Sequence, residues 1–204
     1  MIEAVRDAVL AVRCAGCGEA GAWFCVACRD SCEPVSPRGP LAIRGAGAYA
    51  GPLRTAIHRL KYGEEPALAA DLGALLALEL ARDLAAGVAL DVVVPVPLHR
   101  SRAVSRGYDQ AALLAATVAA RTGLPLRTAL HRVRGGRPQV ELDRVARAAN
   151  VRKAFVAEAG SLRKLAVALV DDVATTGATL TDAAAAARAA GARAVRAYVI
   201  AVDE

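Results

Sequence analysis

The chain has 204 residues and a 55% apolar content that is rich in alanine, which fits one domain of ordinary size or one domain plus a small appendage. Its formal charge of +6 favours an anionic partner such as a phosphate ligand or nucleic acid. Aromatic residues make up 3% of the chain, so the base-stacking platform of single-strand binding proteins is not evident. No segment approaches the roughly 18 apolar residues of a membrane helix, and residues 1–7 carry acids where a signal peptide would be apolar. We expect a cytoplasmic protein without membrane insertion.

All five cysteines lie in the first 40 residues. Cys14-x₂-Cys17 and Cys25-x₂-Cys28 are separated by seven residues, and two such thiolate pairs can complete a tetrahedron around Zn²⁺. The spacing predicts a closed, structural zinc site on these four cysteines. Metal-free thiols or redox pairs are the alternative. Cys32 is a spare thiol that could replace one ligand.

Residues 33–40 hold three prolines and a glycine, which predicts a linker or an irregular crossing. We therefore expect two units, a zinc-ribbon-like module over residues 1–40 and a larger domain over residues 41–204. In the larger domain strands are expected at 42–50, 91–94, 165–170 and 194–202, and helices at 51–61, 66–86, 108–122 and 179–190. This alternation predicts an α/β fold with a mostly parallel sheet flanked by helices.

Two acids and a threonine-rich turn follow the predicted strand 165–170. A helix start presents unpaired N–H groups and partial positive charge to a phosphate, and a glycine lets the backbone approach it closely. Adjacent carboxylates can accept hydrogen bonds from two neighbouring ribose hydroxyls and can lie near Mg²⁺. The candidate residues are Asp171 and Asp172 for the sugar and Thr175, Thr176, Gly177, Ala178 and Thr179 for the phosphate.

Residues 170–179 resemble the phosphoribosyl pyrophosphate signature of type I phosphoribosyltransferases. The remaining chain resembles the ComF (competence protein F) family within that superfamily. The segments that carry this resemblance are 49–54, 57–62, 94–100, 106–110 and 150–155. The chain departs from the family pattern at two places. Tyr108-Asp109 replaces the usual Phe-Asn, and residues 61–65 are a shortened form of the family's Lys-Tyr-x-Gly-Asp-like stretch. The resemblance also implies an N-terminal zinc module.

Basic residues lie near the predicted site. By resemblance the loop after residues 91–94 binds pyrophosphate, so Arg100, Arg102 and Arg106 could clamp it bidentately. A solvated basic loop is the alternative. Lys61 could reach an anion at the site, or it could merely be a cation that stabilises the carboxyl end of its helix. The basic stretch 132–153 matches a flexible flap of the related enzymes, although it could equally track a nucleic-acid backbone.

The resemblance leaves two functions open. An enzyme would hold phosphoribosyl pyrophosphate with Mg²⁺ and transfer the phosphoribosyl group to a nitrogen acceptor. A component of DNA uptake in natural competence would instead bind single-stranded DNA and proteins of the competence machinery. No residue stands out as a general base, so the sequence does not identify the acceptor.

Overall fold

The computed structural model describes residues 12–98, 104–133 and 154–203. Its main sheet has the strand order β1-β2-β7-β6-β3, in which β2, β7, β6 and β3 are parallel and β1 is antiparallel to β2. The strands are β1 (Val35–Arg38), β2 (Ile43–Ala48), β3 (Val92–Pro95), β6 (Ala166–Ala174) and β7 (Ala194–Val202). The predicted α/β class with a mostly parallel sheet is confirmed.

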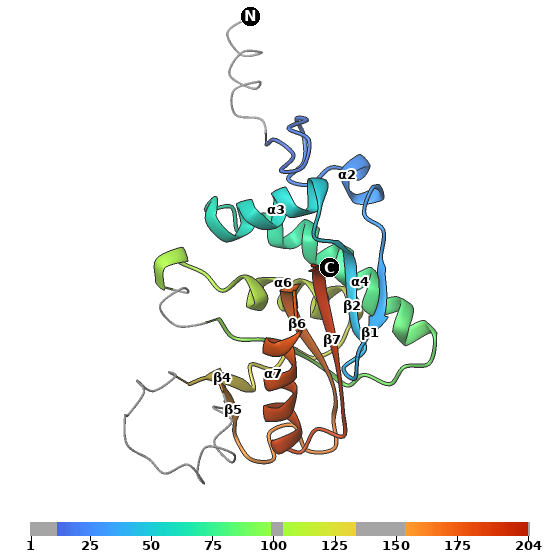
Figure 1. Ribbon diagram of the computed structural model, residues 1–204, viewed down its shortest axis with the longest axis vertical. Helices are drawn as coiled ribbons and strands as arrows, with labels where there is room; N and C mark the ends of the chain where they lie inside the picture. The colour runs from blue at the N-terminus through green and yellow to red at the C-terminus, as the bar shows by residue number, and fades with distance from the viewer. Residues whose placement is uncertain (1–11, 99–103, 134–153, 204) are drawn as a thin grey trace, which may run out of the picture.

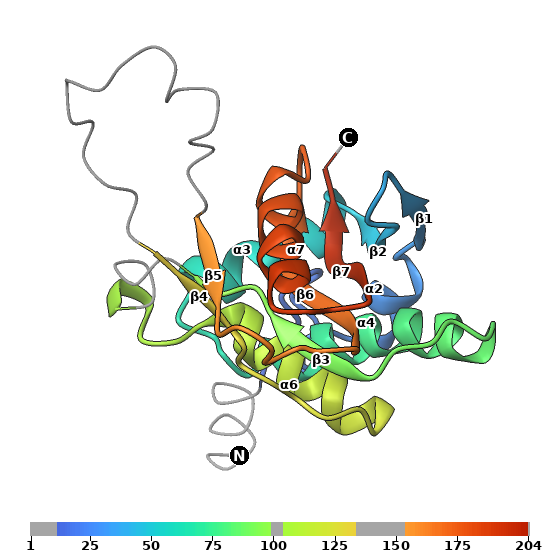
Figure 2. The same ribbon diagram turned by 90° about the horizontal axis from the view of Figure 1, so that it is seen from below.

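Helices cover both faces of this sheet (Figure 2). One face packs against α3 (Gly51–Tyr62), α4 (Leu68–Ala85) and α6 (Gln110–Thr122), and the other against α7 (Ala178–Ala189). A short antiparallel pair, β4 (Leu130–Arg132) and β5 (Phe155–Ala157), packs beside α7. In Figure 1 the carboxyl ends of β6 and β7 point toward α3, which places α3 beside the edge where ligands bind in such sheets.

Strand β6 lies between β7 and β3 and is apolar on both faces, as an interior strand of a parallel sheet must be. Its residues 166–170 are fully buried, and they pair with 194–198 of β7 and, from residue 167, with 92–95 of β3. Ala168 and Val170 face α4 and α6, whereas Val167 and Leu169 face α7. The buried strand therefore fixes the position of the polar residues at its end.

Two local features hold α6 in place. Asp109 caps its first turn by accepting a hydrogen bond from the Ala112 N–H over 3.1 Å. Farther along, Gly73 of α4 meets Thr117, and a Cβ at position 73 would lie 2.6 Å from the Thr117 Cβ. The missing side chain lets the two helices approach closely. Helix α6 is thus fixed against α4 while its first turn faces the carboxyl edge of the sheet.

The N-terminal segment is joined to the larger domain. The predicted linker 33–40 contains β1, which pairs with β2, so the structure corrects that prediction for residues 35–38. The segment's Cys14, Phe24 and Cys28, the last in α2 (Val26–Asp30), belong to the same buried cluster as α3 and α4. The division into units at residue 40 stays a prediction.

Among the described residues, no helix combines the length and the apolar character needed to cross a membrane. The cytoplasmic location expected from the sequence stays a prediction.

Candidate functional site

Asp171 and Asp172 lie inside β6, which runs four residues farther than the predicted strand end at residue 170. The parallel partner β7 extends to Val202 and continues the hydrogen-bonded ladder beside them. Asp172 is 6% exposed, and both of its carboxylate oxygens have partners. Lys61 Nζ lies 2.9 Å from Oδ1, and Gln110 Nε2 donates to Oδ2 over 2.8 Å. Lys61 therefore lies beside the acid pair as the counter-ion of Asp172, and its contact with a ligand anion stays a prediction.

Asp171 has a different environment. Its Oδ1 accepts a hydrogen bond from the Asp172 N–H over 2.8 Å, and no cation among the described residues forms an ion pair with it. Burial of the carboxyl and repulsion by the Asp172 carboxylate raise the pKa of Asp171 well above its ordinary value, despite the opposing charge of Lys61. The site thus contains one compensated acid and one uncompensated acid side by side.

The loop after β6 begins helix α7 at Ala178. Thr175, Thr176 and Thr179 are exposed, and among the hydrogen bonds of the described residues none uses the backbone N–H of Thr175, Gly177 or Thr179 as donor. Gly177 has a φ of +72°, and a Cβ there would lie 3.0 Å from the Ile43 side chain. Free N–H donors at the start of a twelve-residue helix form a suitable site for an anion.

A cavity of about 370 Å³ lies beside Lys61 and is also lined by Tyr62, Glu64, Ser105, Arg106 and Tyr108. The Arg106 guanidinium carbon lies 4.8 Å from the centre of the Tyr62 ring, and its Nη1 is buried without a hydrogen-bond partner. A buried, unpaired guanidinium N–H is costly unless a ligand or water satisfies it. Of the three predicted arginines the structure therefore places Arg106 at a polar cavity, whereas Arg100 and Arg102 lie outside the described residues.

Two residues to which the sequence gave no role prove to organise the site. Gln110 is 3% exposed and holds Asp172, while its Oε1 has no partner among the described residues. Asp109 caps α6 through its Oδ1. Its Oδ2 accepts a hydrogen bond from the Leu98 N–H over 3.1 Å. Asp109 thereby holds Leu98 within the predicted pyrophosphate loop. The signal was present in the 106–110 motif, because an Asp before a helical stretch is a typical N-cap.

Most of the predicted basic flap, residues 134–153, lies outside the described residues. Of the residues that begin this stretch, Arg132 lies in β4, and its guanidinium carbon is 5.1 Å from the centre of the Phe155 ring.

Cys14, Cys17, Cys25 and Cys28 are positioned to bind a metal ion, since their four sulfurs lie within 4.8 Å of one another. Burial opposes ionisation of Cys14, but backbone N–H donors from Cys25, Cys17 and Gly16 outweigh it and lower the pKa of Cys14 to about 6. A thiolate is the form that binds metals. Cys32 lies outside this cluster, and its thiol donates to the Cys28 carbonyl oxygen over 3.3 Å.

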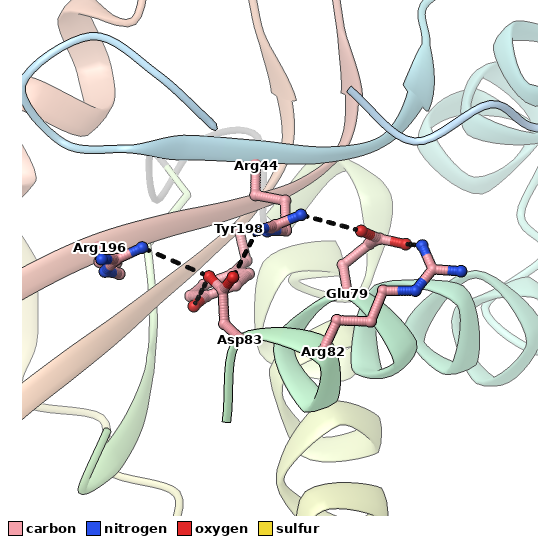
Figure 3. A network of polar contacts seen from close by, with 6 residues as sticks. All are labelled: Arg44, Glu79, Arg82, Asp83, Arg196 and Tyr198. Atoms are coloured by element: carbon pink, nitrogen blue, oxygen red, sulfur yellow. Dashed lines mark hydrogen bonds and ion pairs between the residues drawn. The ribbon is translucent and has the colours of Figure 1, made fainter. Parts of the chain in front are cut away.

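A second polar cluster is buried on the α4 face of the sheet, toward the amino ends of the strands (Figure 3). Asp83 accepts a hydrogen bond from the Tyr198 hydroxyl over 2.7 Å and forms ion pairs with Arg44 and Arg196. Glu79 forms ion pairs with Arg44 and Arg82. All four carboxylate oxygens have a partner, and Arg44 Nε is the cluster's one buried polar atom without a partner among the described residues. Desolvation raises the pKa of Glu79 and of Tyr198.

Comparisons with known proteins give relatives across most of the chain. It is 30% identical over 175 residues to competence protein F of Haemophilus influenzae, covering 83% of this chain and 75% of that protein. It is 34% identical over 139 residues to the DNA utilization protein YhgH of Salmonella typhi, covering 67% of this chain and 61% of that protein. No family model matches.

Among solved structures, the chain is similar to the glutamine phosphoribosylpyrophosphate amidotransferase of B. subtilis. The sequence identity is 28% and the TM-score is 0.48, over 65% of this chain and 26% of that one.

Proposed function

The chain belongs to the competence protein F family, and we propose that it binds a ribose 5-phosphate ligand, with phosphoribosyl pyrophosphate as the best candidate. The observation that carries this proposal is the end of β6, where an uncompensated acid precedes a helix start with free N–H donors. The resemblance of residues 170–179 to the phosphoribosyl pyrophosphate signature supports it. An ordinary strand-turn-helix has no need of two adjacent acids, one buried and one half-buried, at that position.

Each end of the ligand has a matching group. The N–H groups of residues 175–179 would receive the 5-phosphate, because they provide donors and the partial positive charge of a helix start. Asp171 would accept the ribose hydroxyls, since its second oxygen has no partner among the described residues. Lys61 and Arg106, which line one cavity, would bind a diphosphate together with Arg100 and Arg102 of the predicted loop. Mg²⁺ would neutralise part of the diphosphate charge.

A transfer reaction follows from the same arrangement. A nitrogen nucleophile would form a bond to the anomeric carbon as the bond from that carbon to the pyrophosphate oxygen breaks, and pyrophosphate would leave with the electron pair. Cations around the diphosphate would stabilise the leaving group, and the carboxylates would stabilise the positive charge that develops on the sugar. The nitrogen acceptor would lose its proton to solvent, since no side chain stands out as a general base among the described residues.

Binding can be tested by titration calorimetry with ribose 5-phosphate. We expect Gly177→Ala to weaken binding at least about tenfold, because the new methyl group must occupy a left-handed backbone position and displace Ile43. The matched control is Gly123→Ala, which has a φ of +74° at the far end of α6 and open space around it. Both changes should cost about 1–2 kcal/mol of stability. Equal affinities in the two variants would contradict the proposed phosphate site.

Turnover is tested separately. The protein with Mg²⁺ and phosphoribosyl pyrophosphate is mixed with a panel of bases and amines, and released pyrophosphate is measured. Release with one acceptor would establish a phosphoribosyltransferase. Binding without release across the panel would restrict the function to ligand recognition.

For the four-cysteine cluster we propose structural Zn²⁺, because a closed set of four thiolates leaves no open position for a substrate. Elemental analysis of the purified protein should give one zinc per chain. Cys17→Ser should lower the zinc content and the unfolding temperature, whereas Cys32→Ser, which changes a thiol outside the cluster, should change neither.

A second candidate function is DNA uptake, since relatives carry the names competence protein F and DNA utilization protein. In this role the chain would contact single-stranded DNA and other proteins of the competence machinery. The +6 charge supports a polyanionic partner.

A further inference from the structure

The outer side of α3 has a composition that sets it apart from the other helices. Arg54, His58 and Tyr62 are exposed and follow one another at intervals of four residues, so they form a ridge along one side of the helix. The ridge spans about 12 Å, from eight residues at 1.5 Å rise. No acidic residue occurs between Gly51 and Tyr62.

Aromatic rings and cations alternate along this α3 ridge. The Arg54 guanidinium carbon lies 5.8 Å from the centre of the Tyr49 ring, and the His58 and Tyr62 rings lie 4.9 Å apart. Arg106 lies against Tyr62 at the other end. Tyr62 is 64% exposed, an unusual situation for a large ring in a chain with few aromatic residues. The sequence therefore suggested no stacking surface, yet the fold gathers three of the four tyrosines beside α3, namely Tyr49, Tyr62 and Tyr108.

The cations of the ridge differ in whether they are already paired. On α3 itself Arg59 pairs with Glu65 and Lys61 with Asp172. Arg54 and Arg106 form no ion pair with any described residue, so their charge remains available to a phosphate. The end of the ridge at Tyr62 also lines the cavity that contains Lys61 and Arg106.

We propose that the α3 ridge binds single-stranded DNA, whose bases stack on Tyr62 and whose phosphates contact Arg54 and Arg106. Exposed rings next to unpaired arginines are the combination by which proteins bind single strands without sequence preference. The strand leads into the cavity at the carboxyl edge of the sheet. This inference locates the DNA contact of the second candidate function and does not depend on ribose 5-phosphate binding.

The test is fluorescence anisotropy of the full chain with a short labelled oligothymidine. Tyr62→Ala should weaken binding at least about fivefold, because a stacked base is lost, while Tyr62→Phe should retain affinity since the ring remains. Arg54→Gln should weaken binding and reduce the slope of log affinity against log salt by about 0.7, the value for one phosphate contact on a single strand. Arg188→Gln, an exposed arginine near the end of α7, is the matched control and should change neither quantity.

Three results would overturn the proposal: full affinity in Tyr62→Ala, equal effects of Arg54→Gln and Arg188→Gln, or equally tight binding of duplex DNA. Tighter binding of single-stranded RNA of matching sequence would overturn the assignment to DNA. Ribose 5-phosphate is titrated into Arg54→Gln in parallel, and unchanged affinity is expected. If Arg54→Gln loses DNA binding and keeps ribose 5-phosphate binding, the loss is specific to the α3 ridge. If the unmodified chain does not bind ribose 5-phosphate, only the proposed ligand site is contradicted.

Discussion

Two groups of acids lie at opposite ends of the same sheet, and they differ in how their charges are compensated. Toward the amino ends, Glu79 and Asp83 have every oxygen bound by arginine or Tyr198 (Figure 3). At the carboxyl edge, Asp172 is paired with Lys61, but the adjacent Asp171 has no cation partner among the described residues. A compensated buried acid can hold two elements in register, whereas an uncompensated one stores an unfavourable energy that a ligand can relieve.

The largest expected effect comes from breaking the compensated cluster. Asp83→Ala removes the acceptor of the buried Tyr198 hydroxyl and the counter-ion of the half-buried Arg44 and Arg196, which should cost about 3–5 kcal/mol of unfolding free energy. Urea unfolding measures this loss. Ribose 5-phosphate affinity should be unchanged at a temperature where the variant is folded. A parallel loss of affinity would show that the Asp83 cluster and the carboxyl edge of the sheet are coupled.

The next effect is at the carboxyl edge. Lys61→Met leaves Asp172 with Gln110 as its one partner among the described residues, and it should cost about 1–3 kcal/mol of stability. It should also weaken phosphoribosyl pyrophosphate binding about tenfold or more, because a cation beside the diphosphate is lost. Arg59→Gln is the control on the same helix turn, since Arg59 pairs with Glu65. Similar losses of affinity in both variants would place Lys61 outside the ligand site.

Asp171→Asn should act in the opposite direction on stability. The pKa of Asp171 is raised in the folded protein, so the unfolded chain ionises more readily, and stability decreases as pH rises above the ordinary carboxyl pKa of about 4. Asn removes this penalty and can still accept the Asp172 N–H. We expect the variant to be more stable by about 0.5–2 kcal/mol at neutral pH and to bind ribose 5-phosphate poorly. Equal stability at pH 4 and a growing difference toward pH 7 would identify the carboxyl as the cause.

The smallest effect is expected from Tyr198→Phe. It removes a single hydroxyl donor to Asp83, and the two arginines keep that carboxylate paired. The loss should be about 0.5–1.5 kcal/mol in urea unfolding, without a change in ligand affinity. A loss as large as that of Asp83→Ala would mean that the hydroxyl, and not the arginines, compensates the acid.

The sequence predicted the features that depend on local pattern. The strand 194–202 matches β7 at both ends, and the predicted helices match α3, α4, α6 and α7 to within a few residues, because apolar periodicity and caps set them. The family resemblance drawn from the motifs is confirmed by the relatives. The position of the four cysteine sulfurs also agrees with the predicted metal site.

Features that depend on distant partners were wrong or missed. The strand end at 170 was wrong because acids are rare in strands, and the β7 ladder that holds them is formed by residues 28 positions later. Strand β1 was taken as a linker because prolines disfavour central strands, yet an edge strand tolerates one. Gln110 gave no signal of its own, since its partner Asp172 is 62 residues away.

The contact between the cysteine cluster and α3 has one further consequence. A Cβ on Gly16 would lie 2.7 Å from the Cys28 sulfur and 2.8 Å from Pro52, and the Phe24 N–H donates to Asp71 of α4 over 3.0 Å. Cys14 and Cys28 of the cysteine cluster are therefore buried against α3 and α4. With the proposed Zn²⁺ bound to the cluster, metal binding and folding of the sheet would form one linked equilibrium. The amount of intact protein in a cell should accordingly follow the supply of free metal, so that scarcity of the ion lowers its abundance through turnover of unfolded chains.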